Sequence, residues 1–131
     1  MSAPILYDAD CGFCRWSLAQ VLRLDRRHVL RPVALQDPEA ETLLPGKTEE
    51  QRMDSWHLVG DDGRVYSGGA AFAPLLHLVP GGGPAARAVA RFPRLADRAY
   101  RAVADRRSFL GRLIPASSAA RSRERIEADQ R

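Results

Sequence analysis

The feature that most restricts the fold of this chain is the segment DADCGFC, which holds both of its cysteines, Cys11 and Cys14, two residues apart. The apolar run Ile5–Tyr7 precedes the pair and predicts a short buried strand that ends near Asp8. From Cys11 onward, apolar residues recur with a helical period, so a helix is expected over about residues 12–25. The pair therefore lies between a buried strand and the helix that follows it.

The rest of the first 83 residues continues this alternation of strands and helices. A second strand is predicted over residues 29–35, and Pro32 within it favours an edge position, because proline cannot donate a hydrogen bond to a neighbouring strand. Residues 56–66 predict a β-hairpin, since a glycine-containing turn separates two β-rich runs. Further helices are expected over residues 39–44 and 70–79, with a turn near residues 48–53. This order predicts an α/β protein with a mixed sheet and flanking helices.

Charge divides the chain near residue 83. Residues 1–83 carry 8 basic and 11 acidic side chains, whereas residues 84–131 carry 12 basic and 5 acidic ones. Residues 84–131 also contain a basic and an apolar stripe with helical spacing, which predict an amphipathic helix, or two helices with a kink at Pro93. The basic stripe is Arg87, Arg91, Arg94, Arg98 and Arg101, and the apolar stripe is Val89, Phe92, Ala96, Ala99 and Val103. We expect a core over residues 1–83, an Arg-rich helical extension over 84–115 that packs on the core through its apolar stripe, and a polar, flexible tail over 116–131.

The position of the cysteine pair favours redox chemistry. At a helix start, free backbone N–H groups and the helix dipole favour a thiolate, so Cys11 is expected to be the nucleophile. Cys14 lies one turn later on the apolar face, where it should keep its proton and then attack the mixed disulfide that Cys11 forms. A C-x-x-C pair near a βαβ pattern in a cytosolic chain is typical of a thioredoxin-like redox protein. Such chemistry needs no bound cofactor.

Zinc binding uses the same cysteine spacing, but a structural zinc site needs two more ligands. The three histidines, His28, His57 and His77, lie too far apart for a zinc finger, so no intramolecular metal site is expected. Three alternatives stay open: an intermolecular zinc clip built from the cysteines of two chains, a binding module that uses the basic helix and is switched by the redox pair, and a merely structural pair.

The sequence also bears on location and partners. The first residues lack a basic segment followed by a long apolar run, and no apolar run approaches the roughly 20 residues of a membrane span, so a cytoplasmic protein without a membrane span is expected. No aromatic residues interleave the arginine stripe, which disfavours nucleic acid as a partner. The expected partners are a disulfide-containing protein or small molecule and an electron donor, and the residues leave open what these are and what the oligomeric state is.

The segment YDADCGFCRW resembles the sequence for which the DCC family is named, Asp-x-x-Cys-x-x-Cys, here Asp8, Cys11 and Cys14. The segments RPVALQ, DSWHLVGDDGRVYSGGAAF and RAYRAVADRR resemble further regions of that family, so the resemblance covers roughly residues 4–107. It implies a thioredoxin-like, mixed four-stranded sheet with strand two at an edge, and thiol-disulfide oxidoreductase activity. Two departures are Ala9, where the family usually has glycine, and the absence of a proline before Trp56, where thioredoxins place a cis-proline.

Four further residues are candidates for the site. Asp8 is expected either to accept the proton of Cys14 during the second step or to cap the loop by accepting backbone N–H groups. Phe13, in the spacer between the cysteines, is a candidate for the apolar rim of a substrate site. Ser55 and Trp56 are candidates for a substrate-facing loop near the cysteines. Ordinary packing is the alternative for Phe13, Ser55 and Trp56.

Overall fold

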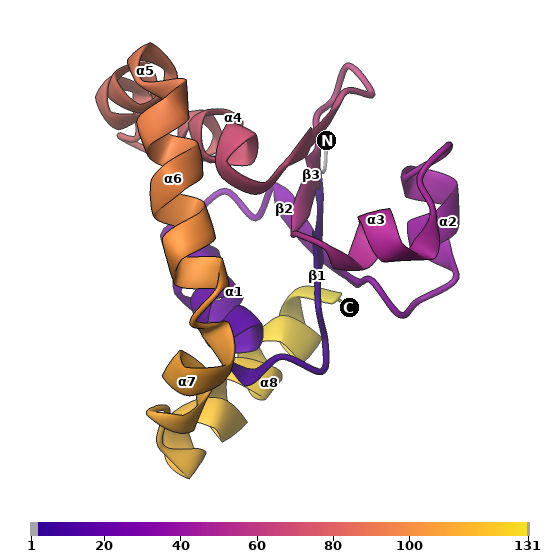
Figure 1. Cartoon of the computed structure of the whole chain (residues 1–131). Helices are drawn as coiled ribbons and strands as arrows, with labels where there is room; N and C mark the ends of the chain where they lie inside the picture. The colour runs from indigo at the N-terminus through magenta and orange to yellow at the C-terminus, as the bar shows by residue number, and fades with distance from the viewer. Residues whose placement is uncertain (1–2, 131) are drawn as a thin grey trace.

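The computed structural model describes residues 3–130 and contains a four-stranded sheet with strand order β2-β1-β3-β4 (Figure 1). The strands are β1 (Ala3–Tyr7), β2 (Leu30–Ala34), β3 (His57–Val59) and β4 (Val65–Ser67). Strand β1 runs parallel to β2 and antiparallel to β3, and β3 and β4 form the predicted hairpin. The predicted α/β class with a thioredoxin-like mixed sheet is confirmed, and β2, which contains Pro32, lies at the edge.

Helices cover both faces of the sheet (Figure 1). They are α1 (Gly12–Leu24), α2 (Glu39–Leu43), α3 (Glu49–Met53), the 3₁₀ helix η1 (Gly68–Ala71), α4 (Phe72–Leu78), α5 (Gly83–Arg91), α6 (Pro93–Ala104), α7 (Arg107–Arg112) and α8 (Ala116–Gln130). Alternating residues of β1 point to opposite faces, as strand geometry requires. Ile5 and Tyr7 pack with residues of α1, α4 and α8, whereas Leu6 packs with α2 and its neighbours.

The turn between α1 and β2 is closed by a buried carboxylate. Asp25 is almost completely buried, and its two oxygens accept hydrogen bonds from the backbone N–H groups of Val29, at 3.1 Å, and Leu30, at 2.9 Å. A buried carboxylate is tolerated where such donors compensate for its lost hydration. These bonds tie the end of α1 to the start of β2, and so set the position of the helix that carries both cysteines.

His57 in β3 forms a second buried polar contact. Its Nε2 lies 2.9 Å from the carbonyl oxygen of Arg52, so Nε2 donates, and its Nδ1, 2.6 Å from Ser67 Oγ, accepts in the neutral ring. Burial lowers the pKa of His57 below its ordinary value of 6.5. The folded protein therefore binds this proton less readily than the unfolded chain does.

We expect the stability contribution of neutral His57 to be complete above about pH 6.5 and to fall as the pH drops below that value towards the lower folded-state pKa. Thermal melts at pH 7.5 and pH 5.0 test this for the wild type and for His57→Gln. The variant should lose less of its melting temperature between the two pH values. Equal losses in the two proteins would contradict the assignment.

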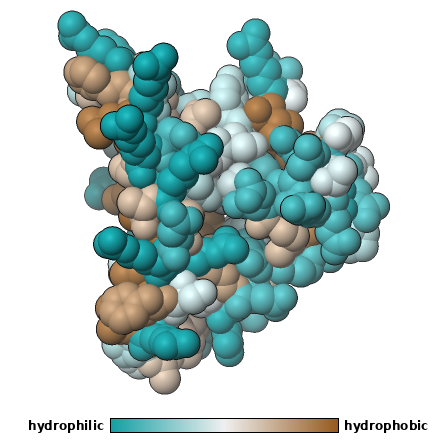
Figure 2. Space-filling view, in the orientation of Figure 1, coloured by the Kyte–Doolittle hydropathy of each residue, from teal (hydrophilic) through white to brown (hydrophobic). Residues whose placement is uncertain are grey.

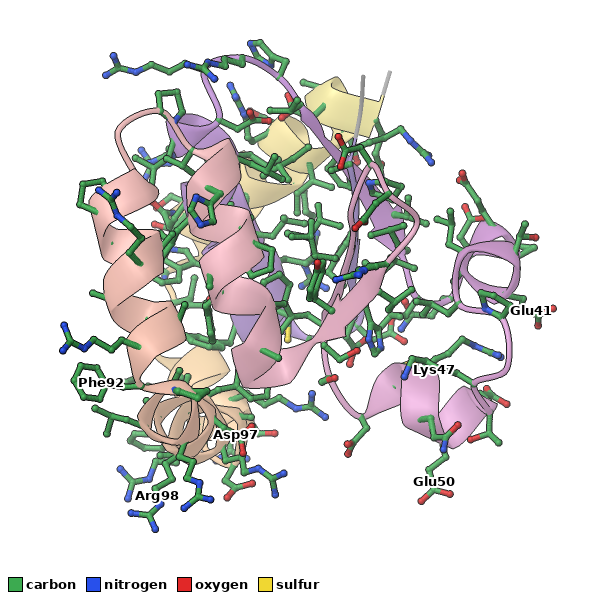
Figure 3. The ribbon with its side chains drawn as sticks, turned by 90° about the horizontal axis from the view of Figure 1, so that it is seen from above. Glu41, Lys47, Glu50, Phe92, Asp97 and Arg98 are labelled. Carbon is green, nitrogen blue, oxygen red and sulfur yellow. The ribbon has the colours of Figure 1, made fainter. Side chains whose placement is uncertain are left out.

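The helical extension lies against the core, but the predicted apolar stripe does not form one buried face: Val89 and Ala96 are half-buried, whereas Phe92, Ala99 and Val103 are exposed. Helix α5 packs on α4, α6 on η1 and α7 on α1. Phe92, expected to be buried, stands at the junction of α5 and α6 with 57% of its surface exposed, and Figure 3 shows it pointing away from the body. Val103 is also exposed. The stripe prediction is wrong because helix α5 ends at Arg91 and α6 begins at Pro93, so that the two helices do not share one face.

The contact of α6 with the core instead uses small residues and one aromatic ring. Tyr100 packs over Gly68, and the backbone around Asp97 approaches Gly69. Figure 2 shows the helical edge of the molecule as hydrophilic groups with apolar groups between them. The large apolar side chains exposed in this region of the chain are Phe92, Leu95, Val103, Phe109 and Leu113.

The prediction of a flexible tail after residue 115 is also wrong, because residues 116–130 form helix α8, which packs against α1 and β2. Ile126 is buried in the same cluster as Tyr7 and Leu18. Arg125 donates from Nη2 to the carbonyl oxygen of Leu22 at 2.9 Å. The helix was missed because it has a single large apolar side chain, and its docking depends on this side chain and on polar contacts.

We expect Ile126→Ala to lower the free energy of unfolding by about 2–4 kcal/mol, the usual cost of removing a large buried aliphatic side chain. Arg123→Ala, at an exposed position of the same helix, is the matched control and should change stability little. Chemical denaturation of the two variants provides the measurement. Similar stabilities would show that α8 does not contribute to the core.

No helix within residues 3–130 combines the length and the apolar character that crossing a bilayer requires.

Candidate functional site

Cys11 occupies the N-cap of α1, directly after the loop that leaves β1. Its backbone is extended, with φ −98° and ψ 112°, and its Sγ accepts a hydrogen bond from the backbone N–H of Cys14 at 3.3 Å. An N-cap side chain normally uses an oxygen to satisfy a free N–H of the first turn. Here a sulfur does so, which places the Cys11 sulfur at the positive end of the helix dipole. Both cysteines are free thiols.

Cys14 lies one turn further along α1, where the protein buries its side chain more than half. Burial raises the pKa of the Cys14 thiol from 9.0 to about 12, helped by its hydrogen bond to Cys11 and by the negative charge of Cys11. The guanidinium of Arg107 acts in the opposite direction, and Asp8 adds a smaller increase. Cys14 therefore holds its proton at neutral pH while Cys11 is in the reduced state.

The loop between β1 and α1 is held by a network around Gln36. Asp8 Oδ1 accepts from the backbone N–H of Asp10 at 2.9 Å and from Gln36 Nε2 at 2.8 Å. Gln36 Oε1 in turn accepts from the backbone N–H of Ala9 at 3.1 Å. The Arg15 guanidinium donates to the carbonyl oxygen of Ala9. Asp8 thus forms the loop-ordering contacts expected of it, and these contacts keep Cys11 at the helix start.

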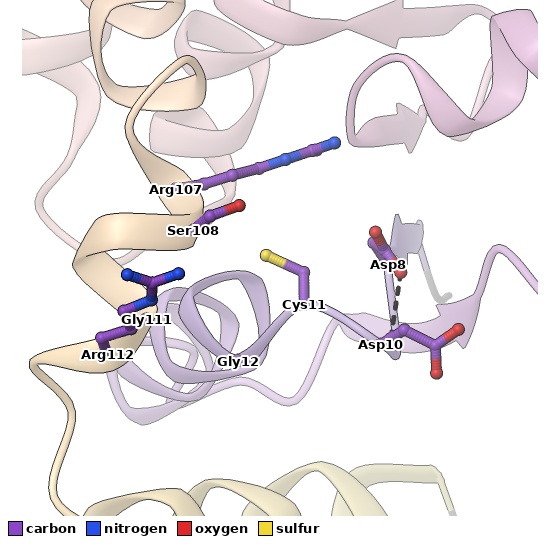
Figure 4. Close-up of a pocket in the computed structure, with 8 residues that line it drawn as sticks. All are labelled: Asp8, Asp10, Cys11, Gly12, Arg107, Ser108, Gly111 and Arg112. Carbon is purple, nitrogen blue, oxygen red and sulfur yellow. Dashed lines mark hydrogen bonds between the residues drawn. The ribbon is translucent and has the colours of Figure 1, made fainter.

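A cavity of about 390 Å³ opens at Cys11, and α7 forms its opposite wall (Figure 4). The Cys11 sulfur points towards α7, and Asp8 and Asp10 lie on the other side of it. The lining residues are Asp8, Asp10, Cys11, Gly12, Arg107, Ser108, Gly111 and Arg112. Helix α7 packs against α1 here, with Gly111 next to the backbone of Phe13. A substrate that reaches the Cys11 sulfur must therefore pass between two acidic and two basic residues.

None of the three predicted substrate-contact residues, Phe13, Ser55 and Trp56, lines this cavity. Phe13 stacks with Trp16, with ring centroids 6.2 Å apart, at the contact between α1 and α7. Trp56 packs against Phe72, with centroids 5.3 Å apart, and belongs to the core cluster. Ser55 lies near Gly68, beside the contact with α6. The sequence thus placed Asp8 and Cys11 together correctly, whereas Ser55 and Trp56 contribute to the packing behind the site.

Tyr100 connects this packing to α6. Its ring contacts Phe72, with centroids 6.0 Å apart, and it shares a hydrogen bond with the backbone of Trp56. Burial raises the pKa of Tyr100, and its hydrogen bond to Trp56 lowers it. Tyr100 thus holds α6 against the core residues Trp56 and Phe72.

Sequence reasoning missed the residues that α6, α7 and the loop after β2 bring to the site, namely Gln36, Tyr100, Arg107, Ser108 and Arg112. None of them stands in a motif with the cysteines, and the arginines were indistinguishable from the many others in an arginine-rich chain. Within the described region of the chain, no three histidine, cysteine or acidic side chains are grouped so that they could hold a metal ion.

Comparison with known proteins gives one match. A family model described as DCC1-like thiol-disulfide oxidoreductase matches residues 5–113. The match includes the cysteine pair, almost all of the sheet and α7, and it leaves α8 outside. Searches of the curated proteins and of the solved structures returned no significant match.

Proposed function

The chain belongs to the DCC1-like thiol-disulfide oxidoreductase family, and we propose that it acts by dithiol–disulfide exchange, with Cys11 as the nucleophile and Cys14 as the resolving cysteine. The observation that carries this proposal is the position of the Cys11 sulfur at the N-cap of α1, where it lines a cavity and accepts a hydrogen bond from the backbone N–H of Cys14. The enzyme is of the protein-disulfide reductase type and uses no bound cofactor.

In the first step the Cys11 thiolate attacks one sulfur of a substrate disulfide. A bond forms between Cys11 Sγ and that sulfur, the substrate disulfide breaks, and the other substrate sulfur leaves as a thiolate. The N–H of Cys14 and the helix dipole favour negative charge on Cys11 before the attack. Arg107 and Arg112 lie on the side from which the substrate enters.

The second step is controlled by the first. Burial is the largest cause of the raised pKa of Cys14, and the next two come from Cys11: the hydrogen bond and the negative charge. The two causes from Cys11 disappear when Cys11 becomes bonded in a mixed disulfide, while Arg107 continues to lower the pKa. Cys14 then loses its proton more readily and attacks Cys11 Sγ, which releases the second substrate thiolate and leaves a Cys11–Cys14 disulfide. The resolving thiol thus becomes more reactive once the mixed disulfide has formed.

Asp8 is the candidate acceptor for the Cys14 proton, because it lines the cavity and its charge acts on Cys14. We expect Asp8→Asn to slow resolution of the mixed disulfide about tenfold or more and to spare the first attack, as loss of a general base does. Single-turnover kinetics measure the two steps separately. If both rates are unchanged while stability falls, Asp8 only orders the loop through Asp10 and Gln36.

The central test uses the reduced protein and hydroxyethyl disulfide. The proposal predicts that the wild type loses both thiols and gains an intramolecular disulfide, and that Cys14→Ser stops at a mixed disulfide on Cys11, which peptide mass spectrometry identifies. Cys11→Ser should form neither product. A mixed disulfide on Cys14 would reverse the roles, and a protein isolated with zinc shared between two chains would favour the zinc clip.

The substrates that fit this chemistry are disulfide-containing proteins or small molecules, and the return to the reduced state requires an external dithiol as electron donor. The cytoplasm suits a dithiol of this kind, because it keeps protein thiols reduced. Trapping with Cys14→Ser in cells identifies the substrate directly. Recovery of secreted proteins alone among the trapped partners would contradict a cytoplasmic location.

A second candidate is the redox-switched binding module, and the exposed junction of α5 and α6 favours it. There Phe92 and Leu95 stand among Arg91, Arg94 and Arg98 around an apolar groove. Heparin, a soluble polyanion, tests this candidate. The binding-module candidate requires that heparin binds differently to the dithiol and disulfide forms of the protein, and that this binding weakens at high salt. Equal binding of heparin by the two forms excludes a redox switch.

A further inference from the structure

The charged groups on the two sides of the cavity at Cys11 differ in their hydrogen bonds and ion pairs. On one side, Asp8 accepts from Asp10 N–H and Gln36, and Asp10 Oδ2 lies 3.3 Å from Gln36 Nε2. On the other side, α7 presents Arg107 and Arg112 (Figure 4). Across residues 3–130, the ion pairs formed within 4.0 Å use other arginines: Arg31, Arg52, Arg64, Arg101 and Arg125. Within the described residues, Arg107 and Arg112 therefore form no ion pair within 4.0 Å.

The two guanidinium groups line the same cavity as the Cys11 sulfur, so a ligand that reaches this sulfur can also contact them. A guanidinium binds a carboxylate through two parallel hydrogen bonds, which is the strongest polar contact that arginine makes. Ser108, between the two arginines in the lining, adds a hydroxyl that can donate to the same oxygens. These donors lie on the side to which the Cys11 sulfur points.

We propose that this wall of the cavity, formed by Arg107, Ser108 and Arg112, selects low-molecular-weight disulfides that carry a carboxylate close to the sulfur. The inference rests on the proposed exchange chemistry and specifies its substrate class. A volume of about 390 Å³ lies within the range of small-molecule sites. With the carboxylate on α7, the substrate sulfur lies towards Cys11 Sγ.

The reaction balances without a further component in a single turnover. The two protein thiols supply two electrons, so one disulfide R–S–S–R becomes two thiols R–SH and the protein becomes the Cys11–Cys14 disulfide. Cys11 Sγ bonds to the sulfur nearer α7, and the first R–S⁻ leaves towards the open side of the cavity. The carboxylate held by the arginines belongs to the half that stays bound until Cys14 releases it.

Three disulfides of similar length and different charge test the proposal: dithiodipropionate, hydroxyethyl disulfide and cystamine, which are anionic, neutral and cationic. The measured quantity is the rate of mixed-disulfide formation with reduced Cys14→Ser, divided by the rate with free N-acetylcysteine methyl ester, an uncharged thiol, under the same conditions. We expect the normalised rate for the anionic disulfide to exceed that for the neutral one about tenfold, and the preference to shrink in 1 M NaCl.

Arg107→Gln and Arg112→Gln, each placed on the Cys14→Ser background, should each reduce the preference for the anionic disulfide by about three- to fivefold, the effect of one partly exposed charge contact. Arg123→Gln, at an exposed position on α8 outside the cavity lining, removes the same charge and should leave the preference unchanged. Because the preference is a ratio of two rates on one protein, a general loss of folding or of Cys11 reactivity does not alter it. Circular dichroism confirms that each variant is folded.

The outcomes separate this inference from the function on which it rests. If reduced protein reacts with none of the three disulfides, the proposed exchange activity fails. If it reacts with all three at rates that follow the free thiol, the exchange activity stands and the anion site is wrong. The anion site is also wrong if Arg123→Gln reduces the preference as much as Arg107→Gln and Arg112→Gln do, because the effect is then one of net charge.

Discussion

Replacing Gly69 by alanine is expected to destabilise the protein by about 3 kcal/mol or more, because a new methyl group would overlap the backbone of α6. A Cβ at Gly69 would lie 2.6 Å from Asp97 Cα and 2.9 Å from Asp97 N. Such distances do not occur between real atoms, and backbone atoms cannot swing aside as a side chain can. Helix α6 must therefore move away from η1.

The displacement should also reach the cysteines. Helix α6 carries Tyr100, whose ring packs over Gly68 and whose pKa responds to Cys14, and it leads directly into α7 with Arg107. Gly69→Ala should therefore slow the attack of Cys11 on a disulfide as well as lower the melting temperature. Gly83→Ala is the matched control, since a Cβ there meets no atom within 4 Å. Equal melting temperatures for the two variants would disprove the close contact between η1 and α6.

Iodoacetamide at pH 7.5 is expected to label Cys11 and to leave Cys14 almost unmodified. The pKa of Cys14 is about 12, so that on the order of one Cys14 in 10⁴–10⁵ is a thiolate at this pH. A more basic thiolate is intrinsically more nucleophilic, which offsets some of this loss. We therefore expect Cys14 to react roughly 50-fold or more slowly than an unstructured cysteine, as measured by mass spectrometry of the labelled peptides.

Two further arms make this labelling experiment decisive. In guanidinium chloride both cysteines should react at the same rate, since the difference comes from the fold. In Cys11→Ala, Cys14 should react faster than it does in the wild type, because the hydrogen bond and the charge that raise its pKa are gone. Faster labelling of Cys14 than of Cys11 in the native wild type would reverse their roles, and an unchanged rate in Cys11→Ala would remove the proposed control of the second step.

The elements up to residue 79 could be predicted because each depends on a local pattern. The run Ile5–Tyr7, the helical period after Cys11 and the glycine-containing hairpin each restrict the backbone within a few residues. Pro32 identified the edge strand, since it lacks the N–H that an inner strand would need. The place of Cys11 at the helix start followed from the same pattern, and with it the candidate nucleophile.

The C-terminal region was harder to predict because its helices depend on where they dock. An apolar stripe suggested one continuous buried face, but the break between Arg91 and Pro93 turned Phe92 outward. Helix α6 docks instead through the absence of side chains at Gly68 and Gly69, which periodicity does not reveal. Helix α8 contributes one large buried aliphatic side chain, Ile126, too few apolar residues for a sequence pattern to indicate a packed helix.

The sequence by itself determined the position of the candidate nucleophile, its helix and the sheet that supports them, because strand–loop–helix geometry is local. Only the tertiary structure decided what surrounds Cys11. Arg107 and Arg112 lie about a hundred residues beyond Cys11 in the sequence and line the same cavity because α7 packs against α1. The proton on Cys14 is likewise a property of the folded state, since burial and the nearby charge of Cys11 hold it there. Charge and burial depend on distances in space, and these are known only when the chain has folded.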